Sequence, residues 1–325
     1  MKLKECLKEF KTKGIIMENK IIVIVGPTAV GKTYVSVELA RKIDSEVVSA
    51  DSMQIYKGMD IGTAKITEQE KKGIKHHMID LINPDEDYSV SDFKDEAEKA
   101  IDGLLAMGKT PVIVGGSGLY VNSLIYDLDF GQAKSNEKLR EYYTYYHREH
   151  GEDALYDKLK RIDPASAERI HKNNVKRVIR ALEVYDLTGR KFSESYTDIR
   201  KKSSKYDCIL VGLSMDRKIL YDRINQRVDK MISDGLVEEV KSLLSKGYEK
   251  NLISMQAIGY KEIIEYLDGN VSLEEAVNIL KRNTRRFAKR QFTWFQKDEN
   301  VKWFQIEDVH KVDDILENIF EYLNV

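Results

Sequence analysis

Short apolar runs alternate with segments of helical periodicity between residues 20 and 125. The candidate strands are residues 20–25, 46–49, 78–82 and 111–114. Runs of this length and composition are typical of buried parallel strands. Residues 33–43 and 91–107 lie between such runs and repeat apolar positions with the spacing of an amphipathic helix. The alternation predicts a doubly wound parallel sheet with helices.

The pattern changes after residue 125. Residues 126–206 are polar, tyrosine-rich and helical in pattern, whereas residues 208–213 are again strand-like and residues 303–306 are typical of an edge strand. We therefore expect an N-terminal extension over residues 1–19, an α/β core and a helical insertion. The core would comprise residues 20–125 and 207–325 with C-terminal helices, and the insertion residues 126–206.

Composition limits the classes of function. The 325 residues carry a formal net charge of −1, so any nucleic-acid binding has to come from local clusters of basic residues. Cys6 and Cys208 are far apart and have no Cys or His pair at metal-binding spacing nearby. No apolar run approaches the length of a membrane span. We expect a cytoplasmic protein that acts as a monomer away from membranes.

A phosphate-binding motif directly follows the first strand. It consists of Gly26, Pro27, Thr28, Ala29, Val30, Gly31, Lys32 and Thr33. Glycines let such a loop curl around phosphate oxygens, and the following helix adds the positive end of its dipole. Lys32 supplies a charge for the terminal phosphates, and the Thr33 hydroxyl is placed for a phosphate-bound Mg²⁺. The motif indicates a P-loop NTPase-like core that binds a diphosphate or triphosphate, but it leaves open whether a P–O or a C–O bond breaks.

A carboxylate follows the second strand. Asp51 stands at the carboxyl end of that strand, where open α/β sheets bind ligands. It would face whatever lies beside the phosphate loop. Kinases of small molecules also carry an aspartate at this point, and an aspartate that caps a turn would look the same in sequence.

Further motifs accompany these two in a fixed order. They are Ala50-Asp-Ser-Met-Gln-Ile-Tyr56, Met59-Asp-Ile-Gly-Thr-Ala-Lys65, His76-His-Met-Ile-Asp80, Tyr88-Ser-Val-Ser-Asp-Phe93, Val114-Gly-Gly-Ser-Gly-Leu-Tyr120, Arg177-Val-Ile-Arg-Ala-Leu-Glu183, Ala257-Ile-Gly-Tyr-Lys261 and Ala288-Lys-Arg-Gln-Phe-Thr-Trp294. With this set the chain resembles the bacterial tRNA dimethylallyltransferases from residue 20 to residue 304. Ser117 replaces the threonine usual in that family and keeps the hydroxyl.

The resemblance implies a prenyl transfer. The dimethylallyl group of dimethylallyl diphosphate would move to N6 of an adenine at position 37 of a tRNA anticodon loop, and diphosphate would leave. Asp51 is implied to be the general base and Thr33 to steady the departing diphosphate. Ser52, Met53 and Gln54 would line the pocket of the flipped-out base.

Two arginines are candidates for the diphosphate. Arg223 and Arg227 lie four residues apart on a helix expected after Asp216, beside a stripe of apolar residues. Arginines in such a position are commonly only solvated. The family resemblance places one of them on the diphosphate, and Arg227 is preferred.

A basic cluster suggests where RNA binds. Residues 281–291 contain six basic side chains and no acidic one, which is typical of a phosphate-tracking surface. Together with Asp51 and its neighbours Ser52–Gln54, the residues expected to contact tRNA or the adenine are Ser117, Arg140, Arg177, Arg180, Gly259, Tyr260, Lys261, Arg286, Lys289, Arg290 and Gln291. His76 and His77 are expected to be structural.

Three rival functions remain. A small-molecule kinase would use Asp51 to deprotonate a hydroxyl, but it leaves the insertion and the basic cluster unexplained. Prenyl transfer to a free adenine nucleotide has the same weakness. An RNA-binding ATPase would need a Walker B strand that ends in an aspartate, and no such strand is found at the expected place.

Overall fold

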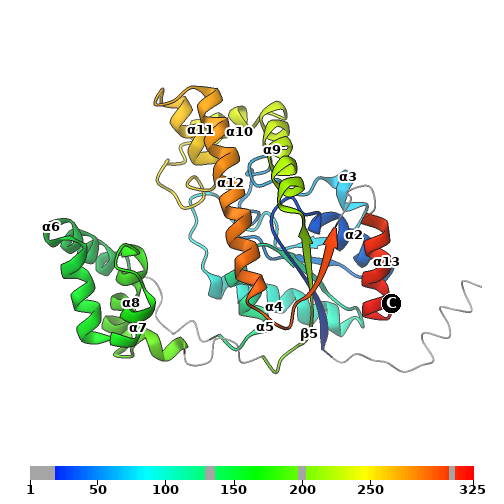
Figure 1. Cartoon of the computed structure of the whole chain (residues 1–325), viewed down its shortest axis with the longest axis horizontal. Coiled ribbons are helices and arrows are strands. Elements are labelled where there is room, and N and C mark those ends of the chain that lie inside the picture. The colour runs from blue at the N-terminus through cyan, green and yellow to red at the C-terminus, as the bar shows by residue number, and fades with distance from the viewer. Residues whose placement is uncertain (1–18, 129–135, 197–202, 307–311) are drawn as a thin grey trace, which may run out of the picture. The chain divides into compact units, whose positions relative to one another are not determined.

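The computed structural model describes residues 19–128, 136–196, 203–306 and 312–325 (Figure 1). The predicted N-terminal extension lies outside the described residues apart from Asn19. The chain divides into two compact units at 125/126 and at 203/204. Tyr206 belongs with the larger unit, where its hydroxyl donates to Asp102 Oδ1 at 2.7 Å.

The larger unit is built on a parallel sheet. Its strands are β1 (Lys20–Val25), β2 (Val47–Ser49), β3 (His76–His77), β4 (Val112–Gly115), β5 (Asp207–Met215) and β6 (Lys302–Ile306). Within the described chain they form one six-stranded sheet in the order β3-β2-β4-β1-β5-β6, and all pairs are parallel. The predicted doubly wound α/β core is confirmed, and β6 lies at the sheet edge as expected.

The third strand differs from its prediction. An apolar run suggested residues 78–82, but the strand is His76–His77, and His76 pairs with Val47 of β2. Met78 and Asp80 adopt left-handed backbone conformations with φ of 64° and 55°. Such conformations break the regular hydrogen bonding of a strand, so the run continues as an irregular segment.

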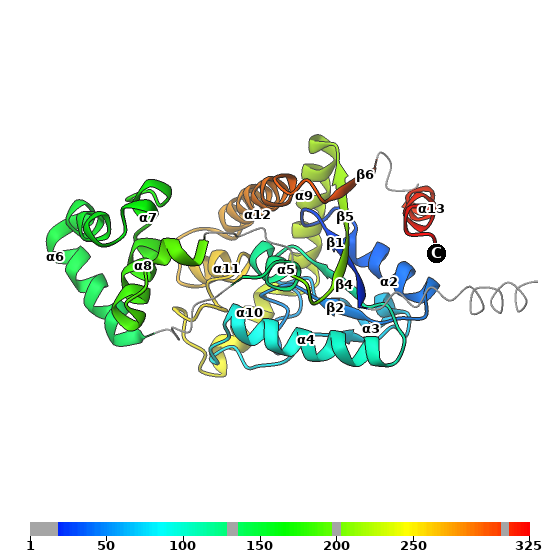
Figure 2. The same ribbon diagram turned by 90° about the horizontal axis from the view of Figure 1, so that it is seen from below.

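Helices cover both faces of the sheet. They are α2 (Lys32–Lys42), α3 (Glu68–Lys71), α4 (Val90–Ala106), α5 (Gly118–Ile125), α9 (Arg217–Ser233), α10 (Leu236–Ser245), α11 (Tyr260–Leu267), α12 (Leu273–Gln296) and α13 (Val312–Leu323). Figure 2 shows α2 and α13 on one side of the strands and α5 on the other. One hydrophobic core joins Ile22 and Ile24 of β1 to α2, α9 and α13, while α4 packs on β2 and α5. Two-sided burial explains why β1 is apolar along almost its whole length.

A second hydrophobic core joins α9, α10, α11 and α12. It also takes in Ile55, Tyr56 and Met59 from the segment after β2. The C-terminal helices therefore support the segment that follows Asp51, because side chains of both share one core.

The secondary-structure elements described in the smaller unit are helices. It contains α6 (Glu137–Ile162), α7 (Pro164–Arg169), α8 (Val175–Thr188) and a 3₁₀ turn, η1 (Phe192–Tyr196). Gly151, with φ of 82° and ψ of 173°, breaks α6 into two helices. The unit has its own core, in which Leu155 and Leu159 of α6 meet Val178 and Leu182 of α8. In neither unit do the described residues include a helix long and apolar enough to span a membrane.

Candidate active site

The phosphate loop connects β1 to α2, as predicted. Gly31 precedes the helix in a left-handed conformation with φ of 108°, and no side chain caps the first turn. The first N–H groups of α2 are thus available to an anion, at the positive end of the helix dipole. Gly26 has φ of 148°, and a Cβ there would lie 2.5 Å from Leu213 O of β5. Only glycine fits this turn.

Lys32 lies inside the loop. Its Nζ donates to Gly26 O at 2.9 Å and to Pro27 O at 2.8 Å. Burial lowers the pKa of Lys32 to about 7, and the negative charge of Asp51 only partly opposes this effect. A phosphate group at the loop would stabilise the ammonium form, since opposite charges favour the charged state.

Asp51 and its neighbours lie where two adjacent strands end. Asp51 follows β2, and its Oδ1 accepts from the Met53 N–H at 2.9 Å. Ser117 follows β4, and its Oγ accepts from the Ser52 N–H at 2.9 Å. The structure thus brings together Ser52 and Ser117, which are 65 residues apart in sequence. Gln54 Oε1 accepts from Ser49 Oγ at 3.3 Å.

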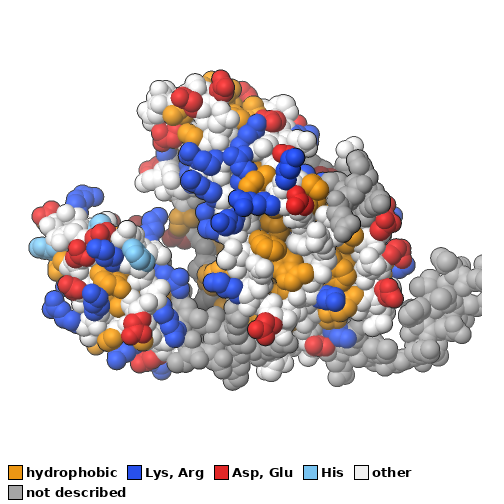
Figure 3. All heavy atoms as spheres, viewed as in Figure 1, with side chains coloured by type: hydrophobic (Ala, Val, Ile, Leu, Met, Phe, Trp, Pro, Cys, Tyr) orange, Lys and Arg blue, Asp and Glu red, His pale blue; other side chains and the backbone are white. Residues whose placement is uncertain are grey.

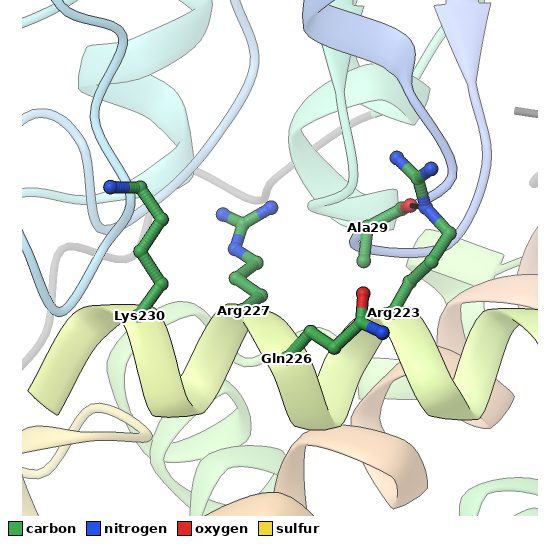
Figure 4. A pocket seen from close by; sticks show the side chains of 5 residues that line it. All are labelled: Ala29, Arg223, Gln226, Arg227 and Lys230. Atoms are coloured by element: carbon green, nitrogen blue, oxygen red, sulfur yellow. Dashed lines mark hydrogen bonds between the residues drawn. The ribbon is translucent and has the colours of Figure 1, made fainter. Parts of the chain in front are cut away.

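Helix α9 places cationic side chains beside the loop. The helix begins after Asp216 as expected, and Asp216 caps it by accepting from two backbone N–H groups. Figure 4 shows Arg223, Arg227 and Lys230 extending from the same side of α9. With Ala29 and Gln226 they line a pocket of about 320 Å³. The pocket is therefore cationic and borders the phosphate loop through Ala29.

The two arginines differ in their contacts. Arg223 Nε donates to Ala29 O at 2.8 Å, which ties α9 to the phosphate loop. Arg227 makes no hydrogen bond or ion pair with the residues that the structure describes. Burial lowers its pKa, and Asp51 acts in the opposite direction. Asp51, Lys32 and Arg227 thus lie close enough for their charges to interact.

Lys230 was not predicted as a site residue. It lies three positions after Arg227 and seven after Arg223, so helical spacing alone could have indicated that it shares their face. The Lys230 side chain is 75% exposed and pairs with Asp234 at 3.0 Å.

Two predicted contact residues are buried instead. Gln291 is 5% exposed, and its side chain bridges two loops. Its Oε1 accepts from the Thr28 N–H at 2.8 Å, and its Nε2 donates to Gly116 O at 3.1 Å. Tyr260 is fully buried and donates from its hydroxyl to Glu239 Oε1 at 2.6 Å. Both side chains hold the loops of the site in this structure, and their contact with RNA or the adenine stays a prediction.

The neighbours of Tyr260 lie at the start of α11. Gly259 precedes the helix with φ of 106°, and its N–H donates to Glu262 Oε2 at 2.8 Å. Lys261 is half-buried, 3.9 Å from Glu262 Oε1. Among the described residues, neither Gly259 nor Lys261 has a hydrogen bond or ion pair with the phosphate loop.

The basic cluster on α12 divides into two groups. Lys281 pairs with Asp229 at 2.6 Å, and Arg285 donates to Asn225 Oδ1 at 2.6 Å, so both tie α12 to α9. The second group is exposed: Arg282, Arg286, Lys289 and Arg290. Figure 3 shows Lys and Arg side chains gathered over α9 and α12.

The three remaining arginines belong to the smaller unit. Buried Glu183 accepts from Arg140 Nε at 2.9 Å and from an Arg180 guanidinium nitrogen at 2.6 Å. Their opposite charges lower the pKa of Glu183 despite its burial. Arg177 is exposed on the same helix, α8. These contacts fix the direction of two guanidinium groups on the surface of this unit.

His76 and His77 are structural, as predicted. His77 Nε2 lies 2.8 Å from Glu46 Oε2, and His76 Nδ1 lies 2.9 Å from Ile74 O. Burial lowers the pKa of His76.

A parallel α/β sheet with a phosphate loop, a carboxylate and guanidinium groups at one end defines a P-loop-like protein. The model of the IPP transferase family matches residues 54–298. The chain is 54% identical over 305 residues to a tRNA dimethylallyltransferase of Alkaliphilus oremlandii, covering 94% of this chain and 97% of that one. A second relative with the same name, from Acetivibrio thermocellus, is 52% identical over 307 residues, 94% of this chain and 98% of that one. The chain belongs to the tRNA dimethylallyltransferase family.

Solved structures agree with this assignment. The full-length tRNA isopentenylpyrophosphate transferase of Bacillus halodurans has a TM-score of 0.69 and 48% identity, over 94% of this chain and 97% of that one. A eukaryotic dimethylallyltransferase studied in the act of modifying tRNA has a TM-score of 0.77 and 31% identity, over 91% and 76%. The likeness therefore extends from the P-loop core to nearly the whole chain.

Proposed function

We propose that this chain transfers the dimethylallyl group of dimethylallyl diphosphate to N6 of the adenine at position 37 of a tRNA anticodon loop. Diphosphate is the second product. One arrangement carries the proposal: the phosphate loop after β1 and Asp51 after β2 lie at the same end of one parallel sheet, and the cationic face of α9 reaches that loop through Arg223. A base thus lies beside groups that can hold a diphosphate. The names of the relatives support the choice of donor and acceptor.

The leaving group is held by positive charge. As the bond from C1 to the bridging oxygen breaks, its electron pair passes to the diphosphate. The free N–H groups of α2, the Lys32 ammonium and the Arg227 guanidinium stabilise this charge. Arg227 is the better candidate for the diphosphate, because Arg223 already donates to Ala29 O. Thr33 is exposed at the start of α2, where its hydroxyl can approach the bridging oxygen.

The acceptor nitrogen loses its proton to Asp51. An aromatic amine is a weak nucleophile because its lone pair is delocalised, and removal of a proton during attack on C1 compensates for this. The Met53 N–H occupies Asp51 Oδ1, so the other carboxylate oxygen takes the proton. Ser117 holds Ser52 in the adjoining turn, and both line the approach to the base pocket with Gln54.

Mg²⁺ is the expected cofactor. Mg²⁺ commonly takes one or two protein ligands and completes its shell with water and substrate phosphates. The exposed Thr33 hydroxyl suits that mode of binding. Over the described ranges there is no group of three or more His, Cys, Asp or Glu side chains that could hold a metal, so the diphosphate itself would supply most of the ligands. Bound there, Mg²⁺ offsets the charge of the diphosphate.

Exposed basic side chains bind the tRNA. In the larger unit these are Arg286, Lys289 and Arg290. In the smaller unit they are Arg177 and the two guanidinium groups oriented by Glu183. Such contacts hold the RNA backbone without reading its sequence. We further propose that the enzyme works as a monomer in the cytoplasm.

A direct assay tests the proposal. The purified protein is incubated with dimethylallyl diphosphate, Mg²⁺ and unmodified tRNA, and the nucleosides are then analysed by mass spectrometry. N6-dimethylallyladenosine at position 37 is the expected product, and free adenine nucleotides should remain unmodified. Steady hydrolysis of ATP without tRNA, or phosphoryl transfer from ATP, would instead favour the kinase or ATPase reading.

A further inference from the structure

An exposed tryptophan, Trp294, lies beside Gly118, the residue after Ser117. Trp294, near the end of α12, has 47% of its surface exposed, which is high for a large apolar side chain. A Cβ at Gly118 would lie 2.3 Å from Trp294 Nε1 and 2.5 Å from Cδ1. The five-membered ring of the indole therefore rests directly on the backbone at the start of α5. Only a glycine at position 118 permits this contact.

The contact links Trp294 to the turn that carries Asp51. Gly118 directly follows Ser117, whose hydroxyl accepts from the Ser52 N–H. One helical turn before Trp294, Gln291 of the same helix donates to Gly116 O. Two successive turns of α12 are thus anchored to residues 116–118. The indole consequently has a fixed position next to the loop of Ser117, which is bonded to Ser52 beside Asp51.

A row of exposed arginines on α12 leads to Trp294. Arg282, Arg286, Arg290 and Trp294 follow one another at intervals of four residues, and all four are exposed. Successive side chains at this spacing are neighbours on a helix surface. The row therefore combines positive charge with an aromatic ring at the end nearest Gly118. Leu119, also 47% exposed, extends the apolar surface at that end.

We propose that Trp294 is a stacking platform for an unpaired RNA base adjacent to the target adenine, with the phosphates of that strand following the arginine row. The inference rests on the proposed function and adds a residue that positions the RNA substrate. A base that enters an active site leaves its stack, and its neighbour loses a stacking partner. Proteins that bind single-stranded RNA commonly replace such a partner with an aromatic side chain.

Fluorescence provides a test that does not depend on catalysis. The chain has two tryptophans, and Trp303→Phe leaves Trp294 as the only one while preserving an aromatic partner for Phe292. Titration with an unmodified anticodon stem-loop should quench the Trp294 emission. A stem-loop that lacks the two bases flanking the target adenine should bind with little or no quenching. Equal quenching by both RNAs would overturn the proposal.

Kinetics provide the second test. Trp294→Ala should raise KM for tRNA by about 5- to 150-fold, the range for loss of one base–aromatic stack. Trp294→Phe should restore most of the affinity, and Gln296→Ala, an exposed position of the same helix, should leave KM unchanged. With tRNA lacking the flanking bases, wild type and Trp294→Ala should have the same KM. A folded Trp294→Ala variant with unchanged KM for intact tRNA would show that the indole only packs on Gly118.

The two proposals fail in different ways. If wild type does not modify tRNA at all, the proposed function is wrong, whatever the fluorescence shows. Suppose instead that wild type modifies tRNA. If removal of the flanking bases leaves the quenching unchanged, or if Trp294→Ala leaves the KM for tRNA unchanged, only the stacking role is wrong. If Trp294→Ala does not fold, the fluorescence of the Trp303→Phe variant decides.

Discussion

Glu239 of α10 should be a major determinant of stability in the larger unit. Its Oε2 accepts from the N–H groups of Asp60 and Ile61 at 2.9 and 2.7 Å. Its Oε1 accepts from the Gly62 N–H at 3.0 Å and from the Tyr260 hydroxyl at 2.6 Å. One carboxylate therefore holds three consecutive backbone N–H groups and a fully buried tyrosine. Burial, reinforced by Glu239, raises the pKa of Tyr260, so its hydroxyl remains a donor.

Four accepted bonds allow the cost of losing this carboxylate to be worked out. A hydrogen bond to a charged group contributes about 1.5–3 kcal/mol, and a buried donor left unpaired costs about 1–3 kcal/mol. The Tyr260 hydroxyl is the donor that water reaches least, whereas the N–H of Asp60, an exposed residue, is readily hydrated. We therefore expect Glu239→Ala to lower the free energy of unfolding by about 3–5 kcal/mol, which is less than the sum of four separate hydrogen bonds to a charged group. Tyr260→Phe removes one bond of four and should cost about 1–1.5 kcal/mol.

Urea unfolding of wild type, both single variants and the double variant measures these values. The double variant should be less destabilised than the sum of the singles, because Glu239→Ala already removes the partner of Tyr260. Glu238→Ala, whose side chain is 72% exposed on the same helix, is the matched control and should change the free energy of unfolding by less than about 0.5 kcal/mol. A loss below 1 kcal/mol for Glu239→Ala, or strictly additive effects, would refute this reasoning.

Three further outcomes are expected at the site itself. Asp51→Asn should lower kcat by about 10²–10⁴-fold, the range for loss of a general base, and leave the KM for tRNA within a few-fold; near-normal kcat would mean that Asp51 is structural. Because the pKa of Lys32 is lowered to about 7, Lys32 is mostly neutral at pH 8.5. The negative charge of a bound diphosphate should restore the ammonium form of Lys32, so diphosphate binding should take up close to one proton. Calorimetry in buffers of different ionisation enthalpy measures this uptake, which Lys32→Met should abolish; no uptake by wild type would contradict the prediction. Neutralising Arg286, Lys289 and Arg290 together should raise the KM for tRNA and reduce its salt slope by roughly 0.7–0.9 per lost contact, with a much smaller effect on kcat; a folded triple variant with unchanged KM at several salt concentrations would place the RNA elsewhere.

The place of the phosphate loop was predicted correctly from sequence. The phosphate loop is eight consecutive residues between a buried strand and a helix, so its conformation depends on backbone geometry that the glycines impose locally. Asp51 could be placed because parallel strands bring their carboxyl ends to one edge of a sheet. The family relationship was equally accessible, since ordered motifs along the chain are a property of sequence alone.

Tertiary packing decided which polar residues are exposed. Gln291 adjoins Lys289 and Arg290 in sequence, yet its side chain faces Gly116 on another element while theirs face solvent. Tyr260 stands in a predicted contact motif but is buried against Glu239. Local periodicity does not reveal which partner covers a given helix face.

Long-range polar contacts could not be predicted from sequence either, because they depend on how separate elements pack together. Glu239 is 177 residues from Gly62, and no spacing rule connects them. Sequence also misplaced one strand. The apolar run at residues 78–82 suggested a strand, but Met78 and Asp80 have left-handed backbone conformations that a strand does not allow. Sequence alone determined the elements and motifs whose geometry is set by neighbouring residues. The tertiary structure decided which side chains meet, because that depends on how separate elements pack.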